Sequence, residues 1–154
     1  DLKGKRFEFV DKLSLSGYLY PLTYLKTASI DPSAYFGSTV FAGDHHGLLK
    51  LLQNKSVDAI ASTALAFKYL EPSQLRIVAK TGHVPYGAYV AASHLPPAFV
   101  RRVREVLLRL CPENQITRHA ITHGKLNYNT FVYFDDSQYD YVRYVVQAAG
   151  TQLF

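Results

Sequence analysis

The alternation of apolar and polar residues predicts a strand that ends in a small-residue turn and continues as a helix. Residues 6–10 alternate as a half-buried strand does, and residues 17–27 carry apolar side chains at helical spacing. Such a junction has free backbone N–H groups and the positive end of the helix dipole, so it suits an oxyanion. The alternative is an ordinary helix start capped by Ser16. Because Pro21 has no N–H, it leaves the Gly17 carbonyl without a helical partner.

The same patterns predict the remaining elements of the chain. Short apolar runs predict strands at 39–42, 57–61, 75–80 and 88–93. Helical spacing predicts helices at 46–53, 63–69, 96–110, 113–123 and 139–149. Strands and helices alternate through residue 80, which favours an open α/β sheet over an all-β fold or a helix bundle. Residues from 88 onward have little sheet of their own to pack on.

Composition narrows the class of protein and of partner. The chain has 154 residues, enough for one domain or slightly more, with 48% hydrophobic and 19% charged residues. No apolar run approaches the ~18 residues that a membrane span needs. The net charge of +5 favours anionic partners. We find no basic stripe with a nucleic-acid reading motif, so we expect no nucleic-acid partner.

The sequence lacks the full residue pattern of a zinc site and that of a serine hydrolase. His119 and His123 share one helical face, but no clear third zinc ligand accompanies them. Ser14 and Ser16 lack the Gly-x-Ser-x-Gly elbow of serine hydrolases. The single cysteine, Cys111, excludes an internal disulfide. We therefore expect no metal, no cofactor, no catalytic residues and no enzyme activity.

A set of short motifs resembles one family through its order and spacing. The motifs are Asp1–Lys5, Phe9–Asp11, Ser14–Gly17 with Pro21, Ile30–Pro32, Gly43–His45, Val57–Ala59, Leu75–Ile77, Val84–Tyr86 and Leu95–Pro97. Together they resemble the phosphate/phosphite/phosphonate-binding proteins of ABC importers, a branch of the type II periplasmic binding proteins. The resemblance runs from the first residue to about Leu110 and fades in the aromatic C-terminal third.

The resemblance implies a fold class and a division into lobes. Proteins of this family are bilobal and hold the ligand in the cleft between the lobes. The implied fold is an α/β, type II periplasmic-binding-protein-like lobe, with an open mixed sheet flanked by helices and a C-terminal strand-and-helices segment of the other lobe. Residues 1–82 would form lobe two, residues 83–87 the return crossing, and residues 88–154 part of lobe one. The N-terminal part of lobe one would be absent from this chain.

The resemblance also implies a ligand site. The family's Ser-Thr-Ser-Gly oxyanion loop maps to Ser14, Leu15, Ser16 and Gly17. This chain departs at Leu15, where the family hydroxyl is lost and the backbone N–H remains. The family's ligand-contacting histidine maps to His45, although a surface residue in a polar turn is the alternative.

The return crossing adds one candidate and one exclusion. Tyr86 either stacks on or donates to the ligand, or packs at the crossing. Gly87 stands where some family members carry an acidic residue for an amine, which argues against an amino-bearing ligand. The implied function is an extracytoplasmic solute-binding protein fragment that recognises a phosphate- or phosphonate-like oxyanion for ABC import. The alternative is a ligand-sensing domain in a signalling receptor such as a histidine kinase.

These readings set the expected partners and location. The partners would be a small oxyanion and either the membrane permease of an ABC importer or a sensor kinase. The location would be periplasmic or otherwise extracytoplasmic, with or without a membrane anchor. The apolar faces of the helices at 96–110 and 139–149 lead us to expect that the isolated chain either self-associates or needs the absent segment for solubility.

Overall fold

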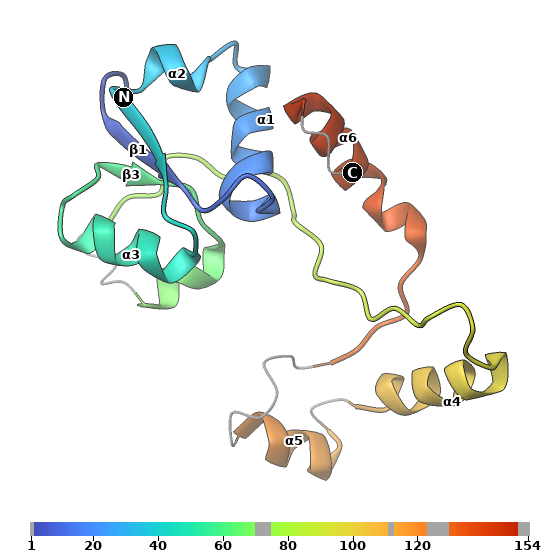
Figure 1. Ribbon diagram of the computed structural model, residues 1–154. Coiled ribbons are helices and arrows are strands. Elements are labelled where there is room, and N and C mark those ends of the chain that lie inside the picture. Colours follow the sequence, from blue (N-terminus) through green and yellow to red (C-terminus); the bar gives the residue numbers. More distant parts are fainter. Residues whose placement is uncertain (1, 70–74, 111–112, 123–129, 151–154) are drawn as a thin grey trace. The chain divides into compact units, whose positions relative to one another are not determined.

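The computed structural model describes residues 2–69, 75–110, 113–122 and 130–150, and the chain forms two compact units (Figure 1). The first, here called the sheet unit, joins Asp1–Pro85 to Tyr139–Phe154. The second, the helical unit, consists of Tyr86–Gln138. The chain therefore leaves the sheet unit and returns to it with its last helix.

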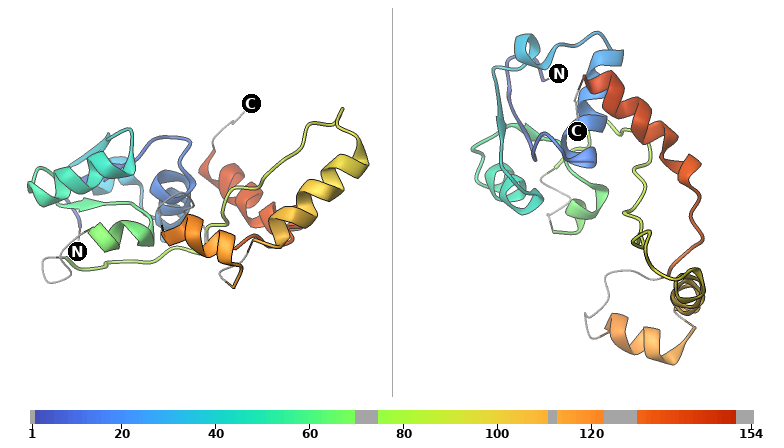
Figure 2. Two further views of the ribbon diagram at one scale, coloured as in Figure 1. Left: turned by 90° about the horizontal axis from the view of Figure 1, so that it is seen from below. Right: turned by 45° about the vertical axis from the view of Figure 1, so that its right-hand side comes forward.

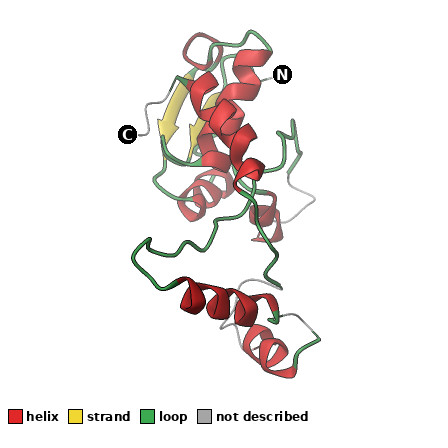
Figure 3. Cartoon of the chain, turned by 90° about the vertical axis from the view of Figure 1, so that its right-hand side faces the viewer, coloured by secondary structure: helices red, strands yellow, loops and turns green. Residues whose placement is uncertain are grey.

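A small parallel sheet forms the centre of the sheet unit. Its strands are β1 (Arg6–Phe9), β2 (Ser38–Phe41) and β3 (Ala59–Ile60), in the order β2-β1-β3. The strands of the described residues all belong to this sheet and are drawn yellow in Figure 3. Both strand pairings are parallel, whereas the resemblance implied a mixed sheet. The carboxyl ends of the strands therefore meet at one edge.

Helices cover both faces of this sheet, whereas the alternation along β1 predicts a strand with one buried face. Phe7 and Phe9 point to the face where they pack with Phe36 and Ala61, near α1 (Tyr20–Thr27) and α2 (Pro32–Tyr35). The opposite face is covered by α3 (His45–Gln53) and the 3₁₀ helix η2 (Ala64–Tyr69), where Leu49 and Ala66 form the core with Ile60. The result is a three-layer α/β arrangement, which confirms the predicted fold class.

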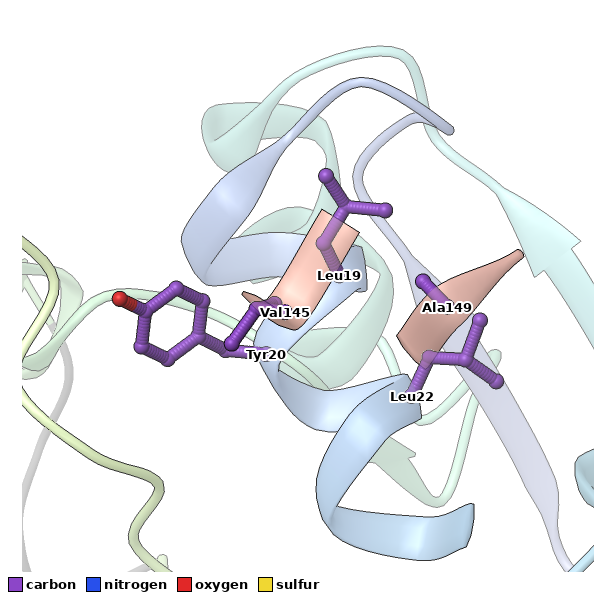
Figure 4. Packing of buried hydrophobic residues seen from close by; sticks show 5 residues of the cluster. All are labelled: Leu19, Tyr20, Leu22, Val145 and Ala149. Atoms are coloured by element: carbon purple, nitrogen blue, oxygen red, sulfur yellow. The ribbon is translucent and has the colours of Figure 1, made fainter. Parts of the chain in front are cut away.

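The last helix, α6 (Asp140–Ala149), packs on α1. Figures 1 and 2 show the two helices side by side, and Figure 4 shows the apolar cluster between them, Leu19, Tyr20, Leu22, Val145 and Ala149. Lys26 Nζ donates to the Ala149 carbonyl at 2.9 Å, where a cation suits the helix C-terminus. Gly150 ends the helix with φ 74°, a left-handed conformation that favours glycine. The assignment of all of 88–154 to lobe one stays a prediction, and in this structure α6 belongs to the sheet unit.

The helical unit contains α4 (Pro97–Leu108) and α5 (Gln115–Thr122). A short 3₁₀ turn, η4 (Asp136–Tyr139), leads out of it into α6. Tyr89 packs edge-to-face on Phe131, with ring centroids 5.2 Å apart.

Two of the predicted strands are wrong. Residues 75–80 and 88–93 have no regular secondary structure, so the C-terminal segment contains helices without the expected strand. An apolar run shows that a segment can be buried in a sheet, but a strand forms only where a neighbour completes its backbone hydrogen bonds. The helix predicted at 113–123 is present as α5 where the structure describes it, and residue 123 lies outside the described residues.

Candidate anion-binding site

The candidate site lies where the strands end. The loop after β1 leads into the π-helical turn η1 (Leu15–Leu19), and the loop after β2 leads into α3. Ser62 follows two residues after β3. Because the strands are parallel, these segments meet at the carboxyl edge, where open α/β sheets bind their ligands.

The turn is tied directly to the end of β1. Pro21, in the first turn of α1, cannot donate to the Gly17 carbonyl, which instead accepts from the Val10 N–H at 3.2 Å. A Cβ on Gly17 would overlap the Val10 side chain, so this contact requires glycine. The wider π turn is typical of functional segments. Gly17 thus has a packing role, and its part in ligand binding stays a prediction.

Ser14, rather than Ser16, caps the turn. The Ser14 Oγ accepts from the Gly17 N–H at 3.1 Å, so the alternative reading with Ser16 as cap is wrong. The Ser16 hydroxyl is left to face α3. No described residue accepts a hydrogen bond from the amides of Leu15 and Ser16. The turn therefore presents two backbone donors and one hydroxyl to whatever binds beside it.

His45 opens α3 and faces these donors. Asp44 caps the helix by accepting from the amides of His46 and Gly47, at 2.7 and 2.8 Å. His45 Nε2 lies 3.4 Å from Ser16 Oγ, so the structure brings together two residues that are 29 positions apart in sequence. Burial lowers the pKa of His45, while the carboxylates of Asp11 and Asp44 oppose that shift. A ring held below its ordinary pKa is neutral at physiological pH.

Ser62 is the residue that sequence reasoning missed. Its Oγ lies 2.9 Å from His45 Nδ1, so the imidazole bridges two hydroxyls, those of Ser62 and Ser16. The available signal was its place just after the predicted strand 57–61, because ligands of open α/β sheets bind beyond the carboxyl ends of the strands. A lone serine in a small-residue stretch did not stand out without the neighbouring histidine.

Leu15 and Tyr86 are two further candidates from the sequence. The Leu15 side chain packs against the apolar cluster between α1 and α6, so its backbone is the part that remains available. Tyr86 belongs to the helical unit and is 66% exposed. Its role toward a ligand stays a prediction.

The described residues show neither a cluster of metal-ligating side chains nor a membrane-spanning helix. Among them, no three histidine, cysteine, aspartate or glutamate side chains gather closely enough to share a metal ion. His119 lies in α5, whereas His123 falls outside the described residues. None of the described helices has the length and apolar character to cross a bilayer.

Comparison with known proteins identifies the family. A family model described as "ABC transporter, phosphonate, periplasmic substrate-binding protein" matches residues 1–139. The chain belongs to this family of periplasmic phosphonate-binding proteins. Among curated family relatives, the phosphate-import protein PhnD of Mycolicibacterium smegmatis is 25% identical over 171 aligned positions. That match covers 99% of this chain and 53% of the relative, so the chain spans about half of its length.

Solved structures confirm the periplasmic-binding-protein fold. PhnD1 from Prochlorococcus marinus, in complex with methylphosphonate, matches with a TM-score of 0.80 and 23% identity. The match covers 97% of this chain and 58% of PhnD1. XAC2383 from Xanthomonas citri, bound to ATP, matches with a TM-score of 0.67 and 17% identity, over 97% of this chain and 60% of that protein. At these identities the likeness concerns the fold alone.

Proposed function

We propose that this chain supplies one wall of the ligand cleft of a solute-binding protein, which takes up a phosphate- or phosphonate-like oxyanion outside the cytoplasm and delivers it to the permease of an ABC importer. The observation that carries the proposal is the pair of amides at Leu15 and Ser16, which have no acceptor in the part of the chain that the structure describes and lie beside the Ser16 hydroxyl and His45 Nε2. Backbone donors at the start of a helix, with the dipole behind them, are a ready site for an anion. The family, and the name of the phosphate-import relative, support the same ligand class.

The ligand would be bound and released unchanged. Ser16 and His45 resemble a nucleophile and a base, but the group that holds the other imidazole nitrogen is the Ser62 hydroxyl rather than a carboxylate. The matching family consists of transport proteins. We expect no turnover of p-nitrophenyl phosphate or p-nitrophenyl acetate above the background rate.

Binding by this chain alone should be weak. A solute-binding cleft draws contacts from both lobes, and the donors described here come from the sheet unit. Without the enclosing contacts we expect a dissociation constant of about 1 mM or above, equivalent to about 4 kcal/mol or less of binding free energy.

An NMR titration tests the proposal at the level of single residues. Inorganic phosphate and methylphosphonate are added separately to the ¹⁵N-labelled chain, with sodium chloride at equal ionic strength as the control. The amides of Leu15 and Ser16 should shift most, because they are the proposed donors. His45→Gln should weaken the response about tenfold, since a charge-assisted hydrogen bond is lost. If the chemical shifts of these two amides do not change while other signals shift, the anion binds elsewhere and the proposal is wrong.

Self-association is the second behaviour that we propose for the isolated chain. Phe99, Val103 and Val106 on α4 are 55%, 41% and 47% exposed. An apolar face left uncovered on this scale tends to find a partner. Sedimentation velocity should show a concentration-dependent shift, and Val103→Lys should abolish it.

A further inference from the structure

Ser62 lies within hydrogen-bond distance of the His45 ring and can therefore influence which ring nitrogen carries the proton. It lies two residues after β3, next to Ala61, whose N–H donates to the Glu8 carbonyl at 3.1 Å and so anchors this point to the central strand. The Ser62 Oγ is 2.9 Å from His45 Nδ1, an ordinary hydrogen-bond distance. The contact between Ser16 Oγ and His45 Nε2 is longer, at 3.4 Å. The ring is therefore held chiefly from the Ser62 side.

A neutral imidazole carries one N–H and one lone pair, so two arrangements fit this geometry. In the first, Ser62 donates to Nδ1 and Nε2–H points to Ser16 and the free amides. In the second, Nδ1–H donates to Ser62 and the Nε2 lone pair points the same way. An oxyanion beside the amides attracts an N–H and repels a lone pair. The two arrangements therefore differ in whether His45 can help to bind an anion.

We infer that Ser62 is a positioning residue for His45: its hydroxyl donates to Nδ1 and thereby keeps the Nε2–H available for the bound oxyanion. This inference rests on the proposed function. It adds the group that decides whether the histidine binds an anion or opposes it. It also explains how a neutral ring contributes a donor at physiological pH without an imidazolium charge.

The charges around the ring make this positioning necessary. The carboxylates that act on His45 are Asp11, from the loop after β1, and Asp44, at the start of α3, while the segment after β3 contributes the uncharged Ser62. Burial outweighs the two carboxylates and lowers the pKa of His45. The imidazolium, which has an N–H at both nitrogens, is consequently scarce at neutral pH. Only the tautomer then determines which group faces the anion.

A pH series on variants separates positioning from simple packing. Phosphate affinity is measured for the full chain and for Ser62→Ala, and the ratio of the two at each pH cancels the titration of phosphate itself. At about pH 8 we expect Ser62→Ala to bind about tenfold more weakly, because the neutral ring loses its fixed tautomer. At a pH low enough for the ring nitrogen shifts to show His45 protonated, the deficit should fall to about twofold, because the imidazolium presents Nε2–H without help. A packing defect would give the same loss at both pH values and would overturn the inference.

Two further variants complete the series. Ser62→Thr keeps the hydroxyl and should bind within about twofold of the unmodified chain at each pH. Ser38→Ala is the matched control, since Ser38 opens β2 at the opposite edge of the sheet and is exposed. It should leave the affinity unchanged. If Ser62→Thr loses as much affinity as Ser62→Ala, the hydroxyl is not the group that acts.

Nitrogen chemical shifts of the histidine ring test the tautomer without any ligand. At about pH 8 the unbound chain should show His45 protonated at Nε2, and Ser62→Ala should show a mixture of tautomers. A ring protonated at Nδ1 in the unmodified chain would overturn the inference. If the tautomer is as expected but phosphate does not bind, the proposed function fails while the positioning stands. If phosphate binds and Ser62→Ala changes neither tautomer nor affinity, the proposed function stands and the positioning fails.

Discussion

Position 15 is where this chain departs from the oxyanion loop that its family resemblance implies, and a substitution there separates packing from anion binding. The Leu15 side chain is half-buried and packs against the apolar cluster between α1 and α6. Its amide has no acceptor among the described residues. Leu15→Thr therefore removes part of an apolar contact and places a hydroxyl on Cβ, from where a χ1 rotamer other than that of leucine can turn it away from the cluster and toward the Leu15 and Ser16 amides.

The two effects have opposite signs on different measurements. Shortening a half-buried leucine by about two carbons, at about 0.8 kcal/mol for each fully buried methylene, lowers the free energy of unfolding by about 1 kcal/mol. A new hydrogen bond to the anion contributes about 0.5–1.5 kcal/mol, which tightens phosphate binding about 2- to 13-fold. The variant should thus be less stable and bind more tightly.

Leu15→Val is the matched control, because valine and threonine have nearly the same shape and differ in the hydroxyl. Urea unfolding should show a loss of stability in both variants relative to the unmodified chain. NMR titration with inorganic phosphate should show tighter binding in Leu15→Thr alone. Equal affinities for the two variants would refute the reasoning, because they would show that the side chain at position 15 faces away from the anion.

Three further predictions concern the packing and charges that support the site. Val145 has no exposed surface, so Val145→Ala should lower the free energy of unfolding by about 2 kcal/mol in urea, while Val90→Ala, at a 90% exposed position, should change it little. Burial raises the pKa of Glu8 above its ordinary value, so the folded state holds the proton to a higher pH than the unfolded chain does. Stability should therefore fall as the pH rises from the pKa of the unfolded chain to the higher pKa of the folded state. Glu8→Gln should remove this fall in a series of thermal melts. The Arg6 guanidinium and backbone amide lower the pKa of Asp58 to about 2, so stability present above about pH 4 should be lost as the pH falls toward 2, and an unaltered acid melt in Asp58→Asn would count against this ion pair.

Local patterns along the chain predicted the elements that build the site. The alternation around Phe7 and Phe9 marks β1, and the change to helical spacing after Gly17 marks the start of a helix. Both depend on side chains close in sequence, so periodicity detects them. The open α/β class followed from the order of strands and helices, whereas the parallel pairing of the described strands replaces the mixed sheet that the family resemblance implied. The family resemblance then selected Ser16 and His45 as candidates, and the structure places these two side chains next to each other.

Other features depended on contacts between distant parts of the chain. The strands predicted at 75–80 and 88–93 are absent, because an apolar run cannot specify whether a neighbour will pair with it. Likewise, the apolar face of α6 is visible in the sequence, but its packing on α1 is not.

The site shows the same division between local pattern and tertiary structure. The sequence shows the hydroxyl residues between positions 14 and 17. That Ser14 rather than Ser16 caps the turn depends on the packing of the turn against the end of β1, where the Val10 N–H donates to the Gly17 carbonyl. Ser62 becomes a candidate only in the folded sheet, where the carboxyl ends of β2 and β3 lie at the same edge and its hydroxyl lies within hydrogen-bond distance of His45. The sequence determines which hydrogen-bond donors are present. The parallel sheet decides which of them lie close enough to bind one ligand, because their proximity depends on strand order rather than on spacing along the chain.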